Sequence, residues 1–245
     1  MQPVQSVVDS LQQQIQDTYP NFRYLPTGMF EHSCSLCYIE ITPEMNYELN
    51  FEYLIERLKP HLNQQQIDTV RHAYEVAATS HSGQKRDEGT PYIVHPVRVA
   101  VSLVDELNLY SATLVCSALL HDVIEDSDVT REAIRQMFND EIAGIVWLLT
   151  KVEEVKLSDY LARIEAAAHT GAPIVKLCDR LDNLRSVAHT PRLEKKRRYI
   201  RTTEDLYLPM AARTNRYLHD ELRRWLEVAR ADLMRIEARR EAGLE

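Results

Sequence analysis

The segment LVCSALLHDVIED, residues 114–126, is an apolar run that ends in four ionisable side chains. If the run continues as one helix, His121 lies a turn before Glu125, and Asp122 lies a turn before Asp126. Carboxylates this close together repel one another, and near a core they are costly to desolvate unless a cation neutralises them. The C-terminal end of a helix also favours cations over anions. The segment therefore predicts a buried helix that carries part of a divalent metal site.

A His-Asp pair is a weak signal when it stands alone. The pair occurs again at His219-Asp220, inside the charged segment YLHDELRRW (217–225). A solvated helix face accounts fully for that second copy, because such side chains are rarely buried. For residues 121–126 the corresponding alternative is a charged end on a core helix, and other parts of the chain must decide between the two.

The composition is that of a helical globular protein. The chain has 245 residues, of which 44% are hydrophobic and 27% charged, and only six are glycine. Plentiful Ala, Leu, Glu, Arg and Gln favour helices over sheets. No apolar run approaches the roughly 18 residues that span a bilayer, and the first 20 residues lack the pattern of a signal peptide. With only four cysteines, the sequence predicts a cytoplasmic protein without membrane contact.

The charge balance narrows the class of ligand. A net charge of −8 and a pI of about 5.6 argue against nucleic-acid binding, which depends on a basic surface. A phosphorylated small molecule is still compatible, because a metal and a few local cations outweigh the global charge within one pocket. The basic run KKRR (195–198) is more typical of a solvated helix face than of a site.

Residues 1–50 differ from the rest and form an N-terminal extension of unassigned role. We expect an amphipathic helix over 5–18 and a short strand at CYIEIT (37–42). Cys34 and Cys37 form a lone C-x-x-C near His32, but a zinc site is not expected without a second pair of ligands. The extension is the expected place for contacts with a partner or with a second copy of the chain.

Residues 51–245 form a second part, for which we predict an all-α, multi-helix domain. Ser111 and Thr130 are expected N-caps, Pro96 opens a helix, and Pro209 breaks the last one. Apolar spacing and loop signals place helices at 51–59, 67–81, 95–107, 111–126, 127–138, 141–151, 157–169, 172–187 and 192–240.

Two further places hold groups that suit metal chemistry. His95 follows a loop at the start of a helix, where a histidine is also a passable turn residue. Asp179 and Asn183 stand at i,i+4 directly after the apolar run APIVKL (172–177). The structural alternative for Asp179 is an ion pair with Arg180 or Arg185.

Although these residues are far apart in the sequence, together they suit a single metal site. Two imidazoles and two carboxylates make a mixed ligand set: His95, His121, Asp122 and Asp179. That set suits Mn²⁺, Fe²⁺ or Zn²⁺ better than Mg²⁺, which prefers oxygen ligands. A metal of this kind activates a bound water near neutral pH, and Glu125 and Asp126 are placed to orient that water or move its proton. Lys85 and Arg86, in the loop before His95, are able to take a phosphate or stack on a base.

These residues carry a resemblance to a known family. In order along the chain, HSGQKR (81–86), GTPYIVHP (89–96), LLHDVIED (119–126), IVKLCDRLDNLRS (174–186) and DLYLPMA (205–211) resemble the hydrolase domain of RelA/SpoT homologues. That domain belongs to the HD superfamily of metal-dependent phosphohydrolases. The resemblance runs from about residue 52 to about residue 225, and a C-terminal helix follows to residue 245. Because it leaves no room for further domains, the chain resembles the single-domain small alarmone hydrolases.

The resemblance implies an all-helical HD fold and a Mn²⁺-dependent activity, with Fe²⁺ or Zn²⁺ as alternative metals. The activity is removal of the 3′-pyrophosphate from guanosine tetra- or pentaphosphate, (p)ppGpp, by a metal-bound water, which gives GDP or GTP. Matched motif by motif, the metal ligands are His95, His121, Asp122 and Asp179, and the water-activating pair is Glu125 and Asp126. Arg86 matches the arginine that packs against the guanine, Asn183 lines the nucleoside pocket, and Lys85 and Ser186 occupy neighbouring positions.

The sequence departs from the family pattern at two places near the expected site, Asp182 and the link that follows Lys151. Asp182 stands where long family members usually carry histidine, and we expect its carboxylate to face out, because an inward carboxylate would weaken the binding of a polyphosphate. The link from Lys151 to Leu157 is shorter and more acidic than in the family.

Two other functions stay open: hydrolysis of another nucleotide such as NADPH, and a retired ligand-sensing module. The second is disfavoured because all six central residues are present.

Overall fold

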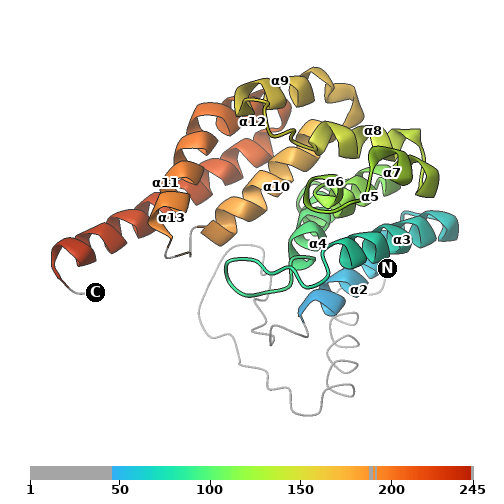
Figure 1. Cartoon of the computed structure of the whole chain (residues 1–245), viewed down its shortest axis with the longest axis horizontal. Coiled ribbons are helices and arrows are strands. Elements are labelled where there is room, and N and C mark those ends of the chain that lie inside the picture. Colours follow the sequence, from blue (N-terminus) through green and yellow to red (C-terminus); the bar gives the residue numbers. More distant parts are fainter. Residues whose placement is uncertain (1–45, 188–189, 191, 244–245) are drawn as a thin grey trace, which may run out of the picture. The chain divides into compact units, whose positions relative to one another are not determined.

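The protein is helical throughout the part that the computed structural model describes, residues 46–187, 190 and 192–243 (Figure 1). Within these residues the only β-type pairing is one isolated bridge between Lys85 and Pro91. The prediction of an all-α domain is therefore confirmed. The expected helix at 5–18, the strand at 37–42 and the cysteine pair near His32 lie outside the described residues. None of the described helices is both long and apolar enough to cross a membrane.

Most helices begin where the sequence predicts. Ser111 and Thr130 cap their helices by accepting hydrogen bonds from the backbone of Leu114 and Ala133, as expected. The α-helices are α2 (Asn46–Leu58), α3 (Gln64–Ser80), α4 (Val94–Val101), α5 (Ala112–Leu120), α6 (Val123–Asp126), α7 (Arg131–Met137), α8 (Asp140–Leu149), α9 (Leu157–Ala166), α10 (Ala172–Val187), α11 (Leu193–Thr202), α12 (Leu208–Thr214) and α13 (Arg216–Glu241). Two π-helical turns, Ser102–Glu106 and Thr203–Tyr207, and a 3-10 turn, Ala168–Thr170, join some of them.

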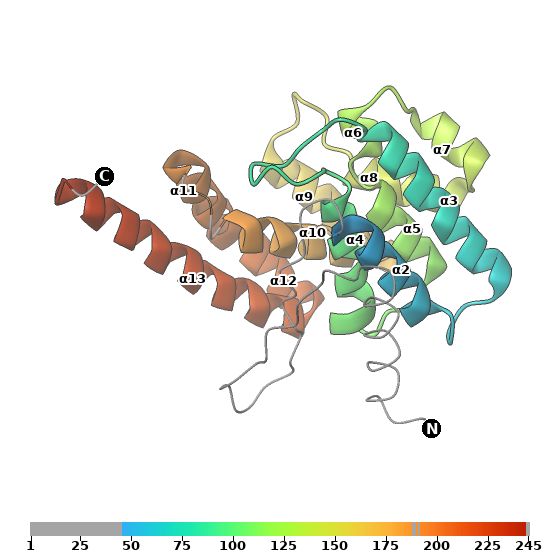
Figure 2. The ribbon, with the colours of Figure 1, turned by 90° about the horizontal axis from the view of Figure 1, so that it is seen from below.

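Two helices organise the packing. α5 is apolar on all sides and contacts α3, α4 and α8, so that Leu119 and Leu120 are fully buried. α10 lies between this group and the C-terminal helices, with α4, α5 and α8 on one side and α11, α12 and α13 on the other (Figures 1 and 2). Any polar side chain on the α5-facing side of α10 is therefore carried into the interior of the domain.

The helix predicted over 111–126 is not continuous. α5 ends at Leu120, the chain turns at His121 and Asp122, and α6 begins at Val123. The imidazole Nδ1 of His121 lies 2.7 Å from the carbonyl oxygen of Ala118, which in an unbroken helix would accept from the backbone of Asp122. The side chain thus replaces a backbone donor, and the bend changes the direction in which the two ionisable side chains point.

The last predicted helix breaks at a different residue from the one expected. Pro209 lies in the first turn of α12, where the missing N–H costs no hydrogen bond, and the chain stays helical through it. The break comes at Asn215, whose backbone is extended and whose side chain accepts from the backbone of Leu218 to start α13.

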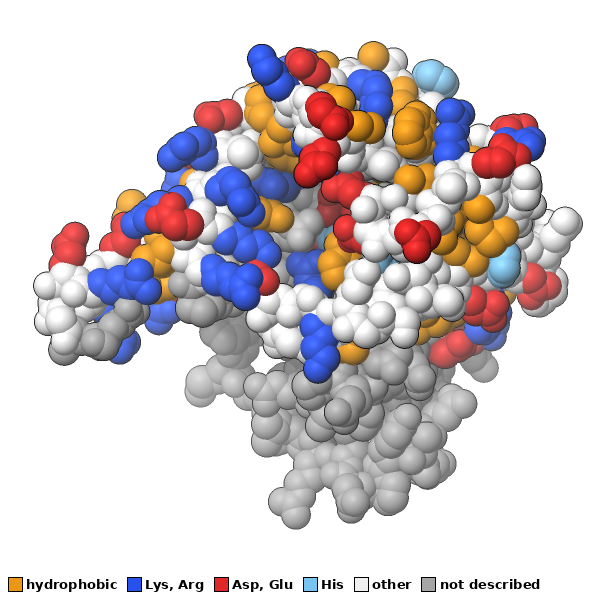
Figure 3. Space-filling view, viewed as in Figure 1, with side chains coloured by type: hydrophobic (Ala, Val, Ile, Leu, Met, Phe, Trp, Pro, Cys, Tyr) orange, Lys and Arg blue, Asp and Glu red, His pale blue; other side chains and the backbone are white. Residues whose placement is uncertain are grey.

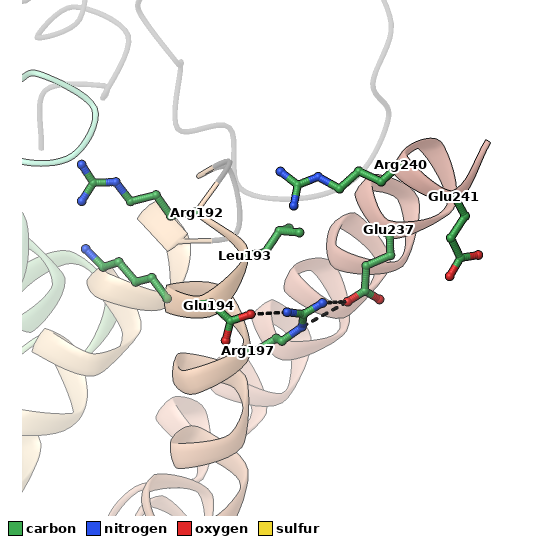
Figure 4. A pocket seen from close by; sticks show the side chains of 8 residues that line it. Arg192, Leu193, Glu194, Arg197, Glu237, Arg240 and Glu241 are labelled. Carbon is green, nitrogen blue, oxygen red and sulfur yellow. Dashed lines mark hydrogen bonds and ion pairs between the residues drawn. The ribbon is translucent and has the colours of Figure 1, made fainter. Parts of the chain in front are cut away.

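The basic run 195–198 is not simply a solvated face, so that expectation is wrong in part. Lys196 is fully buried and pairs with Asp232 of α13. Arg197 lies between Glu194 and Glu237, as Figure 4 shows, and so links α11 to α13. The charge run therefore holds two helices together.

The turn before α10 requires a glycine. Gly171 has φ of +78°, and its N–H donates to the carbonyl of Ala168. A Cβ at this position would lie 2.6 Å from a Leu114 methyl carbon at the start of α5. The residue thus lets the chain reverse into α10 in close contact with α5.

Replacing Gly171 by alanine should lower the free energy of unfolding by about 1–2 kcal/mol, because L-residues are strained at positive φ. Gly144 provides the matched control, since it lies within α8 with open space around it. There the same substitution should raise stability by about 0.5–1 kcal/mol. Urea denaturation of both variants measures the two changes. Equal effects would contradict this account of Gly171.

Candidate metal centre

Four of the side chains singled out in the sequence meet inside the domain. His95 comes from α4, His121 and Asp122 from the turn between α5 and α6, and Asp179 from α10. The Nε2 atom of His95 lies 3.1 Å from Asp179 Oδ1 and 3.7 Å from Asp122 Oδ2. The Nε2 atom of His121 lies 3.1 Å from Asp122 Oδ2 and 3.7 Å from Asp179 Oδ1. The two imidazoles therefore approach the same two carboxylate oxygens, one from α4 and the other from the turn between α5 and α6.

These distances suit ligands of one metal ion. First-row metals bind His nitrogen and Asp oxygen at about 2.0–2.2 Å, so neighbouring ligands at right angles lie about 3 Å apart. His121 gives the sharper test: its Nδ1–H donates to the Ala118 carbonyl, so the lone pair of the neutral ring, the form that binds a metal, is on Nε2. That Nε2 is buried and makes no hydrogen bond to any residue the structure describes. The cluster is therefore suited to a divalent metal.

Burial and charge explain the protonation of the carboxylates. Burial alone would raise the pKa of Asp122, but the positive charge of the protonated His121 ring holds it below its usual range; Asp122 in turn raises the pKa of His121. For Asp179 the largest opposing influence is Lys176, whose Nζ lies 2.8 Å from Oδ2 and which lowers the pKa of that carboxyl. Both aspartates are therefore ionised and available as ligands.

Lys176 is a site residue that the sequence reasoning missed. It lies one turn before Asp179 on α10, and its ammonium also packs 5.4 Å from the centre of the Tyr160 ring. The two arginines of the structural alternative for Asp179 have other partners: Arg180 donates to Thr203, in the π-helical turn after α11, and Arg185 pairs with Glu106. The i,i+3 spacing of Lys176 and Asp179 was the available signal.

The expectation that Asp182 faces outward is wrong. Its side chain is buried, and its Oδ2 lies 2.6 Å from Nδ1 of His95. Arg98 on α4 donates to both carboxylate oxygens, from Nε at 2.7 Å and from Nη2 at 3.2 Å. Because this guanidinium compensates the charge, a carboxylate that would repel a polyphosphate at the surface is tolerated inside.

Glu125 and Asp126 are exposed on α6, beside the cluster. Partial desolvation raises the pKa of both carboxyls, and the charge of Asp122 adds to the rise. The Oε2 atom of Glu125 accepts from the backbone N–H of Lys151 at 2.9 Å. The short acidic link that begins at Lys151 thus helps to fix the position of the Glu125 carboxylate.

Two aromatic side chains complete this side of the cluster, and both were missed. The Tyr92 hydroxyl donates to Asp122 Oδ2 at 2.7 Å and also reaches the carboxyl of Asp126. His81 stacks on the Tyr92 ring, is buried, and hydrogen-bonds through Nδ1 to Gln84. Both residues belong to motifs quoted above, but only the fold shows that they touch the site.

The residues predicted to bind substrate share one pocket. Lys85, Arg86, Asn183 and Ser186 line a volume of about 300 Å³, together with Lys195 and Tyr199 of α11. The Asn183 amide donates to Asp179 Oδ1 at 2.5 Å and accepts from Arg86 at 3.1 Å, so the pocket adjoins the cluster directly. Figure 3 shows acidic side chains in a hollow of this face, with lysines and arginines gathered on the α11 side.

The second His-Asp pair has no such surroundings. His219 and Asp220 lie on α13, Asp220 is exposed, and the His219 Nδ1 is 3.0 Å from the carboxylate. In the described part of the chain, the group of side chains able to hold a metal is formed by His95, His121 and Asp122. The pair at 219–220 is a surface pair, as expected.

Known proteins share this sequence pattern. The chain matches the HD domain family over residues 73–215. It is 36% identical over 185 residues to guanosine-3′,5′-bis(diphosphate) 3′-pyrophosphohydrolase of Aquifex aeolicus, a match that covers 73% of this chain and 26% of that protein. It is 37% identical over 175 residues to the bifunctional (p)ppGpp synthase/hydrolase SpoT of Escherichia coli, covering 66% of this chain and 24% of that protein. The chain spans about a quarter of the length of these curated relatives.

A solved structure agrees with the sequence matches. It is described as a metazoan ortholog of SpoT that hydrolyses ppGpp, and it superposes with a TM-score of 0.55 at 26% sequence identity. The match covers 72% of this chain and 97% of that one. The family match covers more than half of the chain and includes all four residues of the cluster. The chain belongs to the HD domain family and is related to the (p)ppGpp hydrolase domain of RelA/SpoT proteins.

Proposed function

We propose that residues 51–245 form a (p)ppGpp 3′-pyrophosphohydrolase. The observation that carries the proposal is the His/Asp cluster, which adjoins, through Asn183, a pocket whose lining includes Lys85, Arg86 and Lys195. The relatives that hydrolyse the 3′-pyrophosphate of this nucleotide support the choice of substrate. For residues 1–50 we propose a separate extension that serves contacts with a partner or a second copy.

The proposed metal ligands are His95 and His121 through Nε2, and Asp122 and Asp179 through one oxygen each. Mn²⁺ fits two imidazoles and two carboxylates, with Fe²⁺ or Zn²⁺ as alternatives. When bound, the ion supplies charge to stabilise the phosphoryl oxygens and lowers the pKa of water. The protein holds the four donors in place before the ion arrives, because each has a fixed partner in the fold.

Glu125 and Asp126 are the proposed general base pair. Attack by water on the phosphorus attached to the 3′ oxygen breaks that P–O bond, releases pyrophosphate, and leaves a 3′ hydroxyl on GDP or GTP. The water gives up one proton to a carboxylate as it attacks, and the 3′ oxygen takes up one proton as it leaves. Raised pKa values suit Glu125 and Asp126 to this exchange, since a carboxyl nearer neutrality both accepts and returns a proton.

The pocket residues are proposed to hold the nucleotide. Arg86 is fixed on two sides, by Glu88 at 3.2 Å and by Asn183 at 3.1 Å, and a planar guanidinium held in this way presents its face to a base. Lys85 adds positive charge at the pocket wall for phosphate groups, and Lys195 lies there paired with Asp87. Ser186 lies beside Asn183 and accepts from Arg98 at 3.3 Å.

Replacing the base pair and replacing a ligand should have different consequences. In Glu125→Gln with Asp126→Asn, turnover of ppGpp should fall about 100-fold or more, because no carboxylate accepts the proton. Metal content, measured by elemental analysis, should stay near the wild-type value. In His121→Ala both metal and activity should be lost. Loss of metal from the Glu125/Asp126 variant would show that these residues are ligands and would contradict the assignment.

The substrate is tested by product analysis. The purified protein with Mn²⁺ should release pyrophosphate and GDP from ppGpp. NADPH and cyclic dinucleotides, incubated in parallel, should give much slower reactions. Faster release of phosphate from NADPH would replace the proposed substrate, and complete inactivity with metal bound would indicate a ligand-sensing module.

A further inference from the structure

We propose that Asp182 is a positioning residue that makes His95 the stronger of the two imidazole ligands and raises the metal affinity of this chain. The inference rests on the proposed metal site but not on the identity of the nucleotide. It concerns the residue at which the sequence departs from the family pattern, and whose side chain points inward against expectation.

The first step is the contact itself. Asp182 Oδ2 lies 2.6 Å from Nδ1 of His95, and only 5% and 1% of the two side chains are exposed. A carboxylate only accepts, so Nδ1 carries the hydrogen and donates it. The lone pair of His95 is then at Nε2, the atom that faces Asp179 at 3.1 Å. Asp182 thereby selects the tautomer that binds metal through Nε2.

The second step is that Asp182 is itself held in place. Arg98 binds both of its oxygens, and the same guanidinium donates to Ser186 and approaches Glu88 at 3.7 Å. His95 and Arg98 lie on α4, and Asp182 lies on α10. The carboxylate therefore bridges two helices and fixes the plane of the imidazole between them.

The third step is the contrast between the two imidazoles. His121 donates its Nδ1–H to a neutral backbone carbonyl, that of Ala118. His95 donates to an ionised carboxylate, and such charge-assisted hydrogen bonds are shorter and about twice as strong. A carboxylate behind a histidine ligand increases its basicity, and losing such a partner typically weakens metal binding by about 10–100-fold. The geometry thus makes His95 the more electron-rich ligand.

The test is metal affinity in the absence of nucleotide. Chelator-stripped wild-type protein and Asp182→Asn are titrated with Mn²⁺, and free Mn²⁺ is measured by electron paramagnetic resonance. The Asn variant keeps the size of the side chain but loses the charge, so the Kd should rise about 10–100-fold. Asp105→Asn is the matched control: it makes the same change in a carboxylate that is also paired with an arginine, Arg57 of α2, which is not a residue of the cluster. Its Kd should match the wild type.

The outcomes separate this inference from the proposed function. A Kd for Asp182→Asn within twofold of the wild type would overturn the role of Asp182 and leave the metal site intact. Failure of the wild type to bind Mn²⁺ would overturn both proposals. Failure to hydrolyse ppGpp would overturn the substrate alone, because the titration contains no nucleotide.

A second measurement needs no variant and so does not depend on folding of a mutant. In wild-type protein loaded with diamagnetic Zn²⁺, ¹H–¹⁵N spectra of the histidine rings report the ring protons. Both His95 and His121 should carry a proton on Nδ1, and the His95 proton should resonate further downfield because its acceptor is a carboxylate. A His95 proton on Nε2, or the reverse order of shifts, would overturn the proposal.

Discussion

The placement of two imidazoles and two carboxylates in the interior is the constraint on which the other features depend. Burying aspartates is costly unless each has a partner, and every carboxylate here has one. Asp179 is paired with Lys176 within α10, and Asp122 accepts from Tyr92. Asp182, the third carboxylate, is held by Arg98. These side chains meet because the chain turns after α5 and because α10 packs against α4 and α5.

The same helix, α10, carries residues of the proposed metal site and of the proposed nucleotide pocket. Asp179, Asp182 and Asn183 lie within about one turn of α10, so that one face of the helix serves both places. Asn183 contacts Asp179 on one side and Arg86 on the other. A nucleotide that displaces Arg86 therefore acts on the orientation of a proposed metal ligand. In the proposed site, nucleotide binding and catalysis would share these hydrogen bonds of Asn183.

Local features of the fold could be predicted from the sequence, and features that depend on distant partners could not. The caps at Ser111 and Thr130 are set by residues within one turn, and both were predicted correctly. The break after Leu120 was missed because periodicity does not show that the His121 ring takes a backbone carbonyl. The two errors on charged residues have one cause: Asp182 and Lys196 are buried because partners on other helices neutralise them, and spacing along one helix does not reveal such partners.

The most direct test of this account is a crystal structure of the protein grown with Mn²⁺, with anomalous scattering used to locate the metal. We predict one strong peak about 2.0–2.3 Å from Nε2 of both His95 and His121 and from an oxygen of both Asp122 and Asp179. Asp182 should stay on the far side of His95, in contact with Nδ1. A peak elsewhere, or one bound directly by Asp182, would contradict the central claim.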